Sequence, residues 1–129
     1  MFDSSAAAPV VLCICWTINS TNCCSFAALK NDGSVITWGD SEHGGDSTIV
    51  KDNLKNGVSN IFSARNAFAA LKDDGSVVTW GDSKYGGDSS VVSNDLSSGV
   101  INIFSTENAF AALKDDGSVV TWGNSDYGG

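Results

Sequence analysis

The chain has 129 residues, of which 42% are apolar and only 17% are charged, and its formal net charge is −8. This length suits one domain with a modest core, and the apolar content excludes a compositionally disordered chain. The acidic balance disfavours nucleic acids and anionic membranes as partners. The longest apolar run, residues 6–18, is too short for a spanning helix, and no Lys or Arg precedes Lys30 to start a signal peptide. We therefore predict no membrane insertion.

All four cysteines fall in the first fifth of the chain, and the later repeats contain none. Cys13 and Cys15 are spaced to share one face of a strand. A disulfide from this pair to Cys23 or Cys24 would suit an extracellular protein, and four cysteines allow three pairings. Buried free thiols are the alternative, and zinc is the least favoured reading because the spacing matches no standard structural site. Asn19 begins an Asn-Ser-Thr sequon, so it is a glycosylation candidate.

A repeat of 42 residues organises the chain. Residues 66–81, NAFAALKDDGSVVTWG, recur identically at 108–123, and residues 25–39 carry a divergent copy. We set the phase at the Asp that follows Gly-Gly, so that the chain starts and stops near the same point of the motif. The first unit is one residue longer than the others and holds the cysteines. The predicted repeats are 3–45, 46–87 and 88–129, which together form one repeat domain.

The sequence pattern of each repeat predicts three strands. Residues 100–104 alternate and are β-branched, which is typical of a strand. Residues 109–113 and 119–122 read as two further strands, joined by a tight hairpin in which Gly117 supplies a positive φ. The segment 88–99 is rich in Ser and Asp and predicts a short capped helix, with a fourth, outer strand as the open alternative. The expected fold class is all-β, with the option of one short helix per repeat.

One Phe and one Trp recur in every repeat at constant spacing. A three-stranded unit cannot bury its apolar face alone, so stacked neighbours must supply a continuous core. Periodic aromatic residues are most often packing residues, and stacking on a ligand is the alternative. The predicted core aromatics are Phe26, Trp38, Phe68, Trp80, Phe110 and Trp122.

The motif AALKDDGSVVTWG resembles the repeats of the regulator-of-chromosome-condensation superfamily of β-propellers. The resemblance lies in residues 27–39, 69–81 and 111–123, and is strongest in the hairpin of each repeat. It implies three tandem blade-like repeats of a propeller, which normally closes into a ring of more blades. The short unit, which continues as GGDSS, is similar to segments of large bacterial and algal repeat proteins.

Little in the sequence points to catalysis, so we predict that the protein is not an enzyme. The one histidine, His43, stands where the sister repeats have Tyr85 and Tyr127, and no catalytic triad is suggested. The paired carboxylates lie in hairpin turns, where turn chemistry alone favours Asp. Calcium prefers the oxygen ligands that the Gly-Gly loops offer, although their spacing matches no known calcium loop. The weak calcium candidates are Asp40, Asp46, Asp82, Asp88 and Asp126, and no cofactor is otherwise expected.

Three similar repeats with matching ends and no polar cap predict a structural protein. An uncapped stack leaves two open faces that invite another chain. Head-to-tail contact gives a ring where the rotation per repeat closes and a helical filament where it does not. We expect self-association into an extracellular filament or cell-surface assembly. The alternative is a propeller-like lectin that binds glycans in one pocket per repeat, with Trp, Tyr and the Gly-Gly-Asp loop facing the sugar.

Overall fold

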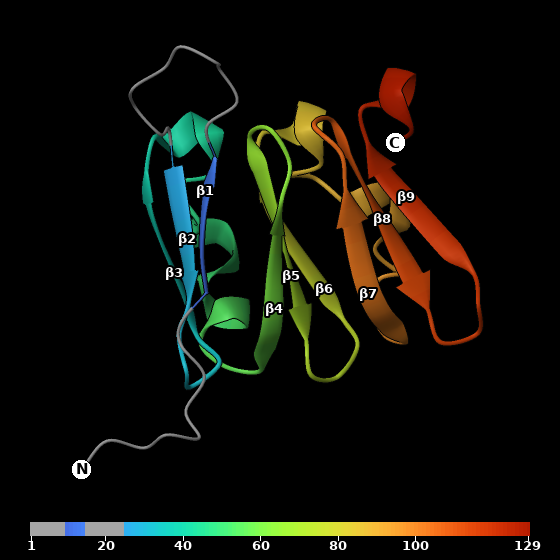
Figure 1. Ribbon diagram of the computed structural model, residues 1–129, viewed down its shortest axis with the longest axis horizontal. Helices are drawn as coiled ribbons and strands as arrows, with labels where there is room; N and C mark the ends of the chain where they lie inside the picture. The colour runs from blue at the N-terminus through green and yellow to red at the C-terminus, as the bar shows by residue number, and fades with distance from the viewer. Residues whose placement is uncertain (1–9, 15–24) are drawn as a thin grey trace.

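The computed structural model describes residues 25–129 in full and residues 10–14 as backbone. Within these residues it contains three antiparallel sheets of three strands, which stand side by side in chain order (Figure 1). The first sheet comprises β1 (Val10–Ile14), β2 (Ser25–Leu29) and β3 (Val35–Gly39); the second β4 (Val58–Ser63), β5 (Ala67–Lys72) and β6 (Val77–Gly81); the third β7 (Val100–Ser105), β8 (Ala109–Lys114) and β9 (Val119–Gly123). The predicted all-β class is confirmed.

The hairpin between the second and third strand of each sheet forms as turn chemistry predicts. In the third sheet, Gly117 has φ +86° and donates its N–H to the Lys114 carbonyl at 3.0 Å. Asp116 Oδ1 accepts the N–H of Ser118 at 2.8 Å and its hydroxyl at 2.6 Å. The carboxylate thus replaces partners that the backbone loses at the turn. The same contacts recur in the other two hairpins, so these sheets have a common register.

Short 3-10 helices occupy the loops between the sheets and the segment after the third sheet. For the segment 88–99 the sequence leaves a short helix and a fourth strand as alternatives. The structure describes this segment in full and has a single 3-10 turn there and no strand. Asp88 Oδ1 accepts the Ser90 N–H at 2.9 Å, and the run of Ser, Asn and Asp that follows favours turns over a longer helix. None of the helices in the described part of the chain is long and apolar enough to cross a membrane. The five are η1 (Ser41–His43), η2 (Thr48–Leu54), η3 (Ser83–Tyr85), η4 (Ser90–Val92) and η5 (Ser125–Tyr127).

Strand alternation gives each sheet two different faces, because successive side chains point to opposite sides. We call the side with the stacked Phe and Trp the Phe/Trp face, and the opposite side the Ala face. The Phe/Trp faces carry Phe26 and Trp38, Phe68 and Trp80, and Phe110 and Trp122 in the first, second and third sheets. The Ala faces carry Ala27 and Leu29, Ala69 and Leu71, and Ala111 and Leu113.

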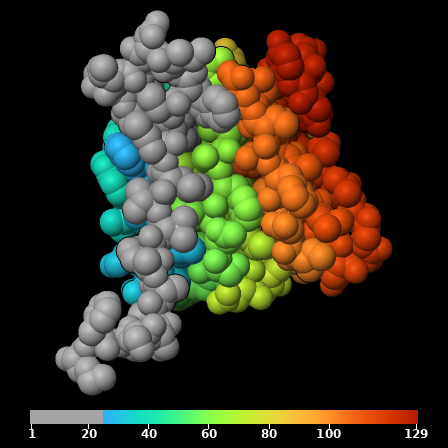
Figure 2. All heavy atoms as spheres, in the orientation of Figure 1, coloured from blue at the N-terminus to red at the C-terminus, as the bar shows by residue number. Residues whose placement is uncertain are grey.

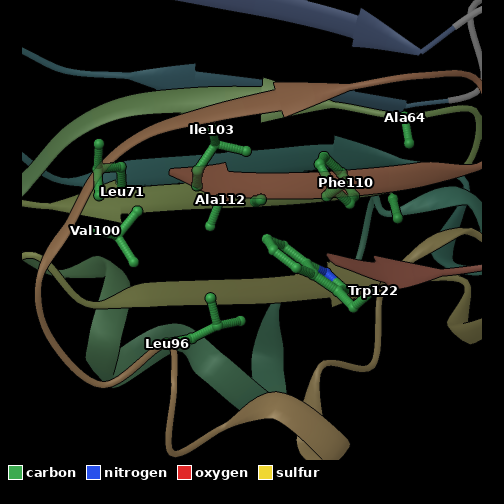
Figure 3. Packing of buried hydrophobic residues seen from close by; sticks show 10 residues of the cluster. Ala64, Leu71, Leu96, Val100, Ile103, Phe110, Ala112 and Trp122 are labelled. Atoms are coloured by element: carbon green, nitrogen blue, oxygen red, sulfur yellow. The ribbon is translucent and has the colours of Figure 1, made fainter. Parts of the chain in front are cut away.

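The sheets stack in one direction, each Ala face on the Phe/Trp face of the next sheet. One apolar cluster joins the Ala face of the first sheet to the Phe/Trp face of the second, and a second cluster repeats this between the second and third. In the second cluster Phe110 lies against the indole of Trp122, among Leu96, Val100 and Ile103 (Figure 3). The atoms of the second and third sheets abut along the face seen in Figure 2. Stacked neighbours therefore supply the core that one sheet lacks.

Candidate functional site: the two outer sheet faces

Two internal junctions show how one sheet binds the next. The indole Nε1 of Trp80 donates to the Gly44 carbonyl at 3.1 Å, and Trp122 donates to the Gly86 carbonyl at the same distance. Each indole also stacks on the Phe of its own sheet, with ring centroids 5.4 Å apart. A buried indole N–H needs an acceptor, and the neighbouring Gly-Gly loop supplies it.

The glycines of these loops are required by the contact itself. Gly44 and Gly86 have φ of +95° and +101°, which side-chain-bearing residues rarely adopt. A Cβ on Gly44 would lie 2.9 Å from the Phe68 ring, and one on Gly86 would lie 2.5 Å from the Phe110 ring. Each loop can therefore lie flat on the aromatic ring of the next sheet only because its residue is glycine.

Backbone and ionic contacts reinforce the junctions. The N–H of Val58 donates to the Gly33 carbonyl, and Val100 donates to Gly75, both at 3.0 Å. Between the second and third sheets, Arg65 donates its backbone N–H to the Glu107 carbonyl at 2.8 Å, and its guanidinium meets the Glu107 carboxylate at 3.0 Å. This ion pair is partly exposed, so we expect it to add specificity more than stability.

The Phe/Trp face of the first sheet has no such neighbour in the described chain. Trp38 stacks on Phe26 with centroids 5.2 Å apart, as in the other sheets, yet Trp38 is 44% exposed where Trp80 and Trp122 are each 4% exposed. Ile36 on the same face is 50% exposed. Large apolar side chains gathered on one face are typical of an interaction surface.

The Ala face of the third sheet also has no neighbouring sheet in the described chain. Val119 is 60% exposed, whereas Val35 on the first Ala face is buried. A Cβ on Gly128 would have nothing within 4 Å, although Gly44 and Gly86 each touch a Phe ring at this position. A hollow of about 140 Å³ lies beside it, with Ala109 and Thr121 in its lining. This face carries the residues that contact the next sheet at the internal junctions.

The structure divides the six predicted core aromatics into two groups. Phe68, Trp80, Phe110 and Trp122 lie in the buried clusters, while Phe26 is half-buried and Trp38 is exposed. Sequence reasoning did not single out Ile36, Val119 or Gly128. Ile36 carried a signal, since the sister repeats have Val there, but the other two match their sister repeats and carried none.

Four of the five calcium candidates use their carboxylates in local hydrogen bonds: Asp40 and Asp82 are the N-caps of η1 and η3, and Asp46 and Asp88 accept from Thr48 and Ser90. Asp40 and Asp82 accept the N–H two residues on at 2.9 Å, and Asp46 accepts both the N–H and the hydroxyl of Thr48. These hydrogen bonds hold the pKa of Asp40, Asp46 and Asp88 below the usual range. Asp126 donates its backbone N–H to Asn124 Oδ1. No three metal-ligating side chains converge anywhere in the part of the chain that the structure describes.

The remaining candidates are scattered. His43 Nδ1 lies 3.2 Å from Asp40 Oδ2 without forming a well-shaped hydrogen bond, and the His43 carbonyl accepts the Ser25 hydroxyl. Tyr85 packs against the second cluster with the Arg65 guanidinium 5.9 Å from its ring centre, and Tyr127 is exposed. Cys15, Cys23, Cys24 and Asn19 lie outside the described residues, as does the side chain of Cys13, so disulfides and glycosylation stay predictions.

Comparison with known proteins identifies the architecture. Neither a family model nor a curated protein matches the chain. Among solved structures it is similar to the crystal structure of yeast RCC1 (Prp20) bound to Kap60, at 20% identity and a TM-score of 0.52. The match covers 79% of this chain and 28% of the yeast chain, so it spans about a quarter of that protein. The likeness shows the fold alone: the three sheets of this chain are similar in fold to blades of the RCC1 β-propeller, as the resemblance of its repeats predicts.

Proposed function

We propose that the protein is a non-enzymatic structural repeat protein that self-associates head to tail, as a filament or surface assembly outside the cell. The contrast between Trp38 and its buried equivalents, Trp80 and Trp122, carries the proposal. The same side chain, in the same stack and register, is covered at two junctions and uncovered at the third position. The partner that fits Trp38 best is therefore a surface like the Ala faces that cover Trp80 and Trp122.

The chain holds that surface itself, on the Ala face of its third sheet. The two outer faces differ from each other, so contact between them is heterologous and repeats in one direction. Such contact builds a filament when the rotation per copy does not close and a ring when it does. The cysteine cluster, the sequon and the low content of charged residues support an extracellular setting.

Electron microscopy of the purified, untagged protein, combined with sedimentation velocity over a concentration series, tests the proposal. We expect species larger than the monomer whose size grows with concentration, and fibres or rings in the images. A protein that stays monomeric up to high micromolar concentration contradicts self-association. Reductant in a parallel sample separates assembly through the sheets from assembly through disulfides.

A glycan-binding role is the second candidate, favoured by a groove that recurs at both junctions. The two grooves have volumes of about 240 and 300 Å³ and are lined by residues 42 positions apart, including Ile49 and Val91. Trp80 and Trp122 each line one of the grooves, but both side chains are buried, so neither ring offers its face to a sugar. A ligand would contact Asp, Ser and backbone groups instead. Saturable binding on a glycan array supports this role, and a blank array argues against it.

A further inference from the structure

We infer that the contact between copies repeats the indole hydrogen bond and the ring contact of the internal junctions, with the Gly128 carbonyl of one copy accepting the indole N–H of Trp38 from a second copy. The inference rests on the proposed self-association and specifies its geometry. Trp80 donates to Gly44 and Trp122 to Gly86, each acceptor 36 residues earlier in the chain. One further repeat moves the acceptor from Gly86 to Gly128. The donor at that step is the Trp of the next sheet, which in a second copy is Trp38.

The aromatic ring follows the same register. Gly44 and Gly86 receive Phe68 and Phe110, and the equivalent place at Gly128 is empty for at least 4 Å. Phe26 of the second copy, already stacked on Trp38, fits there. Gly128 also has φ +101°, the same conformation as Gly86, although no neighbouring sheet holds it in place. The receptor is therefore preformed, which lowers the entropic cost of docking.

The hairpin glycines Gly33, Gly75 and Gly117 support the same register. A Cβ on Gly33 or Gly75 would meet the backbone N of Gly57 or Gly99 at 3.0 and 2.8 Å, whereas Gly117 has nothing within 4 Å. The carbonyls of Gly33 and Gly75 accept backbone N–H groups of the next sheet. Both ends of the third Ala face, at Gly117 and at Gly128, thus offer the two kinds of contact that join the internal sheets.

Two blocked variants test the geometry. Ile36→Lys places a charge on the Phe/Trp face, and Val119→Lys places one on the Ala face; burying either unpaired charge should weaken assembly by roughly 100-fold or more. Ile49→Lys and Val91→Lys are matched controls, because these side chains are 100% and 97% exposed and belong to η2 and η4 rather than to a sheet. Each of the four changes adds one positive charge to the net charge of −8, so a difference in electrostatic self-repulsion does not explain a difference in assembly.

Mixing the two blocked variants gives the decisive measurement by sedimentation velocity. Each alone should be monomeric, while the mixture should form a one-to-one dimer and nothing larger, since each partner keeps one open face. A wild-type protein that does not assemble refutes the proposed function. A wild-type protein that assembles together with blocked variants that still assemble alone, or a mixture without dimer, refutes only the junction described here.

The hydrogen bond has its own test. Trp38→Phe keeps an aromatic ring and removes the N–H donor, leaving the Gly128 carbonyl buried without a partner. We expect the dissociation constant to rise roughly 10-fold. Circular dichroism of the dilute variant should match the wild type, because this indole is exposed in the single chain. An unchanged dissociation constant would show that the indole N–H of Trp38 has no acceptor across the contact.

Discussion

Replacing the same Trp at two repeat positions should destabilise the single chain very unequally. Trp80→Ala and Trp38→Ala remove identical groups from equivalent stacks, but their exposed fractions are 4% and 44%. The difference of 40 percentage points corresponds to about 100 Å² for a side chain of roughly 250 Å². At ~25 cal/mol per Å² this is ~2.5 kcal/mol. The lost Trp80–Gly44 hydrogen bond adds about 1 kcal/mol. Trp80→Ala should therefore lower the free energy of unfolding by ~3.5 kcal/mol more than Trp38→Ala.

Urea denaturation measures this difference, followed by far-ultraviolet circular dichroism because both changes remove a fluorophore. The protein must be dilute enough to be monomeric, so that self-association does not protect Trp38. Trp122→Ala is the internal control: its exposure and hydrogen bond equal those of Trp80, so its midpoint should shift about as far. Equal shifts for Trp38→Ala and Trp80→Ala would refute the assignment of one Trp to a junction and the other to an open face.

Three further predictions concern turns and loops. Gly86→Ala should lower the melting temperature far more than Gly128→Ala in the monomer, because both have φ +101° but only Gly86 touches a Phe ring. Hydrogen bonds from Ser lower the pKa of Asp32, Asp74 and Asp116 below 3.8. Their stabilisation is therefore complete above that pH and is lost as pH falls through the lowered values; melting curves from neutral to acid pH should show this, and a variant with all three Asp changed to Asn should show a flatter profile. Millimolar calcium should leave the melting temperature unchanged if the loop carboxylates act only as caps, whereas a clear rise would establish a calcium site.

Local chemistry made much of the fold predictable. The strand expected at 100–104 is β7, Val100–Ser105, and that at 109–113 is β8, Ala109–Lys114. Alternation with period two and the Gly turn at 117 depend on neighbouring residues only, so a single sequence reveals them. The choice between helix and outer strand for 88–99 depended on whether another strand edge was available, which is a tertiary property.

The repeats predict that two faces are open, but residue identity cannot show which side chains lie on them. The motif around Trp38 nearly matches that around Trp80, yet Trp38 is exposed and Trp80 is buried. Val77 and Val119 stand at equivalent positions of two identical motifs, yet Val77 is half-buried and Val119 is exposed. What differs is whether another sheet lies beyond, and this is set by position in the stack. The sequence makes the Asp residues of the loops weak calcium candidates because they cluster around the Gly-Gly sequences. In the structure, the carboxylates of Asp40, Asp46 and Asp88 accept nearby backbone N–H groups.

In the proposed contact between copies, assembly uses the same kind of junction as folding, so we expect the two to be linked. The two internal junctions form between sheets held together by the chain, so they avoid the loss of translational and rotational freedom that a second copy must suffer, roughly 4–15 kcal/mol. We therefore expect the contact between copies to be weaker than its internal equivalents even where the residues are the same. A change made at the equivalent position of every repeat should weaken the fold and the assembly together. Changes confined to the outer faces, such as those at Ile36, Trp38 or Val119, should separate the two. Ile36 is larger than the Val of the sister repeats, so it adds apolar area to the outer Phe/Trp face.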